Sequence, residues 1–103
     1  MNSITPKDFS KIKNNSDIFL LDVRTQEEWN IVNIGGHLIP MAEIYDRINE
    51  VPQDKQIVVL CHHGIRSAQV ASFLLTRDFS EVQNLLGGID RYAIEVDKNL
   101  QKY

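Results

Sequence analysis

Two short apolar segments constrain the fold of this chain more strongly than any other feature of its sequence. The runs IFLLDV (residues 18–23) and QIVVLC (residues 56–61) are too short for typical helices, and polar turn residues flank them. Continuous apolar runs of this length are typical of strands that are buried on both faces of a sheet. A third short run, EVQNLL (residues 81–86), also predicts a strand. We therefore expect a sheet built around these three segments.

Segments with helical spacing of apolar residues separate these strands. Thr5 and Thr25 are N-cap candidates for the first two helices, and Pro52 would end the third. The third helix is predicted from apolar residues spaced three and four apart, namely Met41, Ile44, Ile48 and Val51. The predicted helices cover residues 6–13, 26–32, 41–51, 67–79 and 89–103. Because strands alternate with helices, we expect an α/β fold with a small parallel sheet and helices on both of its faces.

Composition and charge narrow the classes of function. Hydrophobic residues make up 43% of the chain and charged residues 24%, which is ordinary for a compact protein, so we expect one domain over residues 1–103. The net charge is −3 and Lys and Arg do not cluster, which argues against a nucleic-acid or membrane-surface partner. The first residues, MNSITPKDFS, contain no apolar segment typical of an export signal, and no apolar stretch of about 18 residues occurs, so we expect neither an export signal nor a membrane span. With a single cysteine, we expect a cytoplasmic protein.

That cysteine, Cys61, lies where a predicted strand meets a predicted helix. Ligands of open α/β sheets bind beyond the carboxyl ends of the strands, which is the position of Cys61. Gly64 permits unusual backbone dihedrals, and a helix beginning near Ser67 can direct several N–H groups at one point. Such amides, together with the guanidinium of Arg66, would favour thiolate over thiol. Packing in the core is the alternative interpretation of a lone cysteine, but the Gly, Arg and Ser within six residues favour a nucleophile.

Three segments of the sequence resemble the signatures of single-domain rhodanese-like sulfurtransferases: LLDVRTQEEW, CHHGIRS and NLLGGIDRY. The resemblance covers nearly the whole chain and implies one rhodanese-like domain. In that family a cysteine and the five residues after it form a loop that holds a persulfide, and Cys61 to Arg66 has this length. Cysteine phosphatases and arsenate reductases of the same fold have one residue more between Cys and Arg. A smaller ring of amides suits a single sulfur, whereas a tetrahedral oxyanion needs a wider one.

The resemblance implies that Cys61 takes the outer sulfur of a small anionic donor such as thiosulfate and passes it to a thiol or cyanide acceptor. This is covalent catalysis in two half-reactions. The acceptor is either a small molecule or a protein. Substrate binding is expected from the six residues that follow the nucleophile: His62, His63, Gly64, Ile65, Arg66 and Ser67.

The remaining polar residues carry weaker predictions. Asp22 and Arg24 resemble the family's Asp-Val-Arg, where Arg24 orients the loop or attracts the donor; a strand-end ion pair or turn cap explains them equally well. The segment around His37 departs from the family pattern, so we expect a surface or turn histidine there. His62 and His63 next to Cys61 would chelate one ion poorly, and the sequence reveals no second ligand cluster, so they are expected to tune donor choice. No metal or cofactor is predicted.

Two alternative functions remain open at this stage. The first is a phosphatase or arsenate reductase of the same fold, which the short loop disfavours. The second is a binding module or persulfide relay that acts only with a protein partner. The intact Cys61, Gly64 and Arg66 argue against an inactive site but leave the relay possible.

Overall fold

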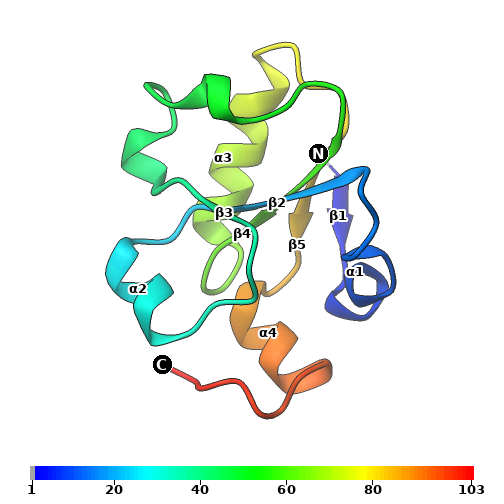
Figure 1. Ribbon diagram of the computed structural model, residues 1–103, viewed down its shortest axis with the longest axis vertical. Coiled ribbons are helices and arrows are strands. Elements are labelled where there is room, and N and C mark those ends of the chain that lie inside the picture. The colour runs from blue at the N-terminus through cyan, green and yellow to red at the C-terminus, as the bar shows by residue number, and fades with distance from the viewer. Residues whose placement is uncertain (1) are drawn as a thin grey trace.

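The computed structural model describes residues 2–103, in which five parallel strands form one sheet with the order β1-β5-β4-β2-β3 (Figure 1). The strands are β1 (Asn2–Ile4), β2 (Ile18–Asp22), β3 (His37–Leu38), β4 (Gln56–Leu60) and β5 (Val82–Leu85). The three strands predicted from apolar runs are confirmed as β2, β4 and β5, and they lie in the middle of the sheet. The two short edge strands, β1 and β3, were not predicted.

Helices cover both faces of this sheet, as the alternating pattern predicted (Figure 1). They are α1 (Pro6–Ile12), α2 (Gln26–Ile31), α3 (Ile65–Leu75) and α4 (Gly88–Glu95). One core cluster joins the sheet to α3, whereas a second joins its other face to α1 and α4. Thr5 and Thr25 cap α1 and α2, and Thr25 forms a reciprocal capping box with Glu28. No helix within residues 2–103 has the length and apolar character needed to cross a bilayer.

The predicted helix over residues 41–51 is wrong. The structure has two single-turn 3-10 helices there, η1 (Met41–Glu43) and η2 (Ile48–Glu50). An isolated helix of this length is marginal, and tertiary contacts decide its conformation. Here the backbone N–H of Met41 donates to the carbonyl of Val23, which ties the segment to the end of β2. Separate turns still place Ile44 and Val51 in the core, so the apolar spacing reflected burial and not a continuous helix.

Other helix boundaries also differ from prediction; α3, for example, was predicted to reach residue 79 but ends at Leu75. α3 begins at Ile65, two residues earlier than expected, because Gly64 ends the preceding loop in a left-handed conformation with φ of +100°. The last helix was predicted to reach residue 103, but α4 ends at Glu95. The side chain of Asp97 accepts a hydrogen bond from the backbone N–H of Asn99, a local turn that competes with helix. The remaining chain runs past α4 and ends beside α2 (Figure 1).

Candidate active site

Cys61 directly follows β4, a central strand of the sheet. The strand ends nearest to it are those of β2 and β5, because Asp22 pairs in register with Leu60 and Asn84 with Val59. Side chains just beyond these three strands therefore converge at one edge of the sheet, as expected for a ligand site in an open α/β fold. The residues predicted to surround Cys61, from His62 to Ser67, follow β4 directly and lie at this edge.

The sulfur of Cys61 is enclosed by its own loop. Gly64 donates its backbone N–H to Sγ at 3.0 Å, and Sγ lies 3.2 Å from the hydroxyl of Ser67. The first N–H groups of α3, which begins at Ile65, have no partner within the helix. Cys61 is only 1% exposed and also contacts core residues. The environment thus combines the burial of a packing residue with a hydrogen-bond donor aimed at sulfur, which a packing residue does not require.

Ser67 connects Cys61 to Asn84, a residue that sequence reasoning missed. The Ser67 hydroxyl donates to Oδ1 of Asn84 at 2.5 Å, while Nδ2 of Asn84 donates to the carbonyl of Gly64 at 3.1 Å. A hydroxyl has one proton, so in this arrangement Ser67 accepts from the Cys61 thiol. When the sulfur is an anion, Ser67 can hydrogen-bond to it only by turning its proton from Asn84 to Sγ. A polar residue inside the apolar run EVQNLL was the available signal for Asn84.

The amino end of α4 holds the loop from the opposite side. Ile89 and Asp90 donate their backbone N–H groups to the carbonyls of Cys61 and His62, at 2.9 and 3.1 Å. Gly88 makes this approach possible, since a Cβ built on it would lie 2.4 Å from both carbonyl oxygens. The GG turn in the sequence therefore fixes the backbone of the cysteine loop.

Arg66 forms an ion pair with an acid, so its positive charge is not available to the sulfur of Cys61 alone. Its two terminal nitrogens lie 2.6 and 2.9 Å from the carboxylate oxygens of Glu28 in α2. The hydrogen bond from Arg66 holds the pKa of Glu28 well below its usual value, and Glu28 in turn raises the pKa of Arg66. Sequence analysis had placed Arg66 beside the sulfur as a positive charge. The structure shows that this charge is largely compensated by Glu28.

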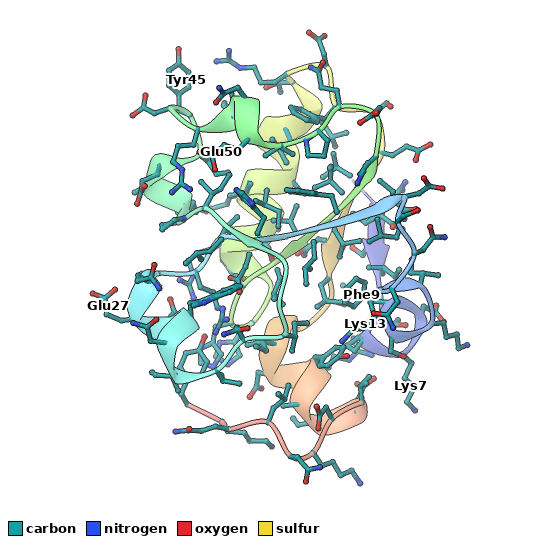
Figure 2. All side chains as sticks on the ribbon, viewed as in Figure 1. Lys7, Phe9, Lys13, Glu27, Tyr45 and Glu50 are labelled. Carbon is teal, nitrogen blue, oxygen red and sulfur yellow. The ribbon has the colours of Figure 1, made fainter. Side chains whose placement is uncertain are left out.

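Replacing Glu28 with glutamine should destabilise the protein at neutral pH and much less in acid. Because its folded-state pKa is depressed, the Glu28 carboxylate stabilises the fold above about pH 4.3, and this contribution is lost as the pH falls further. Urea titrations of both proteins should show a difference in the free energy of unfolding that shrinks below about pH 4. Glu27→Gln is the control, since Figure 2 shows Glu27 projecting outward from α2. A Glu28→Gln difference that stays constant with pH would contradict the assignment.

Asp22 and Arg24 form a fully buried ion pair, with both side chains 0% exposed. Arg24 donates from Nε and Nη2 to the two oxygens of Asp22, at 3.0 and 2.8 Å, and from Nη2 to the carbonyl of Val32 at 2.8 Å. A guanidinium enclosed in this way does not face a dissolved anion. The geometry favours the ion-pair interpretation over attraction of the donor.

Tyr103 links these polar groups to the cysteine loop and was also missed by sequence reasoning. Its hydroxyl accepts from Nη1 of Arg24 at 2.9 Å and donates to Glu28 at 2.7 Å. Its ring stacks on His62 with centroids 3.9 Å apart. Burial raises the pKa of Tyr103 to about 12, so the hydroxyl keeps its proton. No local sequence signal places Tyr103 here, because its partners, Arg24, Glu28 and His62, are far away in the chain.

The histidines occupy different environments. His62 and His63 lie against each other at the loop, with ring centroids 3.8 Å apart, and Asp90 lies beside them. Burial, followed by the charge of His63, lowers the pKa of His62. His37 was expected to be a surface or turn residue; it is part of strand β3, where its partly exposed ring lies 2.7 Å from Glu50.

Comparisons with known proteins match most of the chain. The family profile described as Rhodanese-like domain matches residues 5–95. A sulfurtransferase from Allochromatium vinosum is 32% identical over 89 residues, covering 81% of this chain and 78% of that protein. The probable adenylyltransferase/sulfurtransferase MoeZ of Mycobacterium tuberculosis is 32% identical over 105 residues, which are 98% of this chain and only 27% of MoeZ. A solved rhodanese-related protein from Thermoplasma volcanium has a TM-score of 0.86 at 28% identity, over 93% of this chain and 94% of its own.

Proposed function

This chain belongs to the family of rhodanese-like domains, and from that membership we propose that it is a sulfurtransferase that carries a sulfane sulfur on Cys61. Thiosulfate is the donor class that we propose, with a thiol or cyanide as acceptor. The observation that carries the proposal is the six-residue loop from Cys61 to Arg66, in which the N–H of Gly64 is directed at Sγ.

The size of the enclosure supports sulfur as the transferred group. Cys61 is 1% exposed and its sulfur already lies within hydrogen-bonding distance of Gly64 and Ser67. A single terminal sulfur is narrow enough to approach such an atom, whereas a phosphate ester presents a bulky tetrahedral centre. This argument favours the persulfide chemistry over the phosphatase alternative.

The proposed reaction has two balanced steps. The Cys61 thiolate attacks the outer sulfur of thiosulfate, a new S–S bond forms, and the old S–S bond breaks with its electron pair leaving on sulfite. An acceptor thiolate or cyanide then attacks the outer sulfur of the persulfide, and the Cys61 thiolate leaves. Preorganised donors contribute by stabilising negative charge on the inner sulfur, for which Gly64 and a rotated Ser67 hydroxyl are the candidates.

A protein acceptor is the second form of this proposal. The relative MoeZ is named both an adenylyltransferase and a sulfurtransferase, and this chain matches about a quarter of it. A rhodanese-like domain within a larger protein can deliver sulfur to a neighbouring domain or partner. The exposed side chain of Ile65, 72% exposed and inside the cysteine loop, is a suitable contact for such an acceptor.

Mass spectrometry of the intact protein tests the proposal directly. After incubation with thiosulfate, wild type should gain one sulfur, and cyanide or dithiothreitol should remove it. Cys61→Ser should gain none, because no other thiol exists in the chain. Ser67→Ala serves as a matched variant that keeps the nucleophile and should still be labelled. Equal labelling of Cys61→Ser and wild type, or no labelling of wild type by several sulfane donors, would refute the persulfide.

A further inference from the structure

We propose that His62, His63 and Asp90 form a binding site for a divalent transition-metal ion such as Zn²⁺ at the cysteine loop. One ligand atom from each of the three side chains lies within 4.8 Å of the other two. Nε2 of His63 lies 3.9 Å from Oδ2 of Asp90. The sequence did not suggest this set, because Asp90 is separated from the histidines by all of α3 and β5.

The backbone fixes the relative position of these residues. Asp90 lies in the first turn of α4, and its N–H donates to the carbonyl of His62 at 3.1 Å. His62 and His63 are adjacent in the chain, so one loop and one helix end determine the positions of all three Cα atoms. A site that is largely assembled before binding loses little conformational freedom when it takes a ligand.

The ring of His62 is held in place by an aromatic neighbour. It stacks on the ring of Tyr103, with centroids 3.9 Å apart and the planes inclined by 9°. Neighbours that orient a metal-bound imidazole contribute to metal affinity without touching the ion. The stacked ring of Tyr103 gives His62 such an orienting contact.

The donor set favours a borderline transition metal over calcium or magnesium. Two imidazoles and a carboxylate are usual for Zn²⁺ and related ions, whereas Ca²⁺ and Mg²⁺ require oxygen ligands. Donor atoms bound to one zinc ion lie about 3.4 Å apart, given bonds of about 2.0–2.1 Å. His63 is 59% exposed at its side chain, so a small rotation can close the remaining gap. Three protein ligands leave a further position for water or for a sulfur-containing substrate.

The test uses untagged Cys61→Ser protein, in which no thiol competes for the metal and the proposed sulfur transfer is already removed. Titration calorimetry with Zn²⁺ should show saturable binding of one ion per chain. In this background Asp90→Asn and His63→Ala should each weaken binding by at least about tenfold, as expected for loss of a ligand. The chain's remaining histidine provides the control: His37→Ala should leave the affinity unchanged.

Two results would overturn the metal site. One is the absence of saturable Zn²⁺ binding to Cys61→Ser, which would mean that any binding to wild type uses the thiolate. The other is binding that Asp90→Asn and His63→Ala leave unaltered, whatever the effect of His37→Ala. Neither result bears on persulfide formation, which the mass measurement on wild type decides separately. Circular dichroism of each variant confirms that a lost affinity is not a lost fold.

Discussion

Replacing Arg24 with alanine should lower the free energy of unfolding by about 3–5 kcal/mol, the cost of removing one partner from a buried ion pair. Arg24 and Asp22 are both 0% exposed, and the guanidinium supplies two of its nitrogens to the Asp22 carboxylate. Alanine would leave that carboxylate buried, and within residues 2–103 the backbone N–H of residue 24 would be its one remaining donor. It would also leave the carbonyl of Val32 and the hydroxyl of Tyr103 without their present donor.

Urea denaturation of Arg24→Ala and of Arg77→Ala compares the loss of a buried, paired arginine with the loss of an exposed one. Arg77 is exposed and contacts the rings of Tyr45 and Phe73, so its removal should cost less than about 1 kcal/mol. Figure 2 shows Tyr45 at the periphery of the molecule, far from the cysteine loop. Similar losses in the two variants would show that the buried pair contributes no more than a surface contact.

The central part of the fold was predictable because it depends on local patterns. Short apolar runs identify β2, β4 and β5, since strands in the middle of a parallel sheet are buried on both faces. The edge strands β1 and β3 contain three and two residues, too few for any period to be visible. Their pairing with β5 and β2 depends on the tertiary fold, which no local pattern encodes.

Helical spacing was informative about burial and misleading about conformation. Ile44 and Val51 are in the core as the stripe over residues 41–51 predicted. Met41, at the start of the stripe, is 38% exposed, because the chain turns there and does not continue as a helix. Spacings of three and four residues are satisfied equally by successive tight turns that pack on one face of a sheet.

The cysteine loop was predictable to the extent that it is local. Cys61, Gly64 and Ser67 lie within seven residues, and the structure brings them together as a strand-to-helix loop. The partners that determine its electrostatics come from other elements. Glu28 in α2 compensates Arg66, and Asn84 in β5 orients Ser67. Such contacts depend on which strands are neighbours, so a sequence read along the chain does not show them.

Insertion of one glycine after Gly64 should reduce thiosulfate-dependent sulfur transfer by about a hundredfold, because displacement of a catalytic group by about 1 Å can have this effect. The amide of Gly64 lies 3.0 Å from Sγ, and a residue added directly after it would widen the ring and displace the first N–H groups of α3 relative to the sulfur. Wild type should leave a small aryl phosphate untouched. The widened ring is expected to admit an oxyanion more readily, but hydrolysis also needs a general acid for the leaving group.

A paired assay of both proteins on thiosulfate and on the aryl phosphate measures whether loop length selects the chemistry. The matched control is one glycine inserted after Asp54, in an exposed turn before β4, which should retain sulfur transfer close to that of wild type. Circular dichroism establishes that both insertions fold. Cys61-dependent hydrolysis of the phosphate ester by wild type would favour the phosphatase alternative. Sulfur transfer by the Gly64 insertion at the wild-type rate would mean that the enclosing amides are not what holds the sulfur, and the argument from ring size would fail.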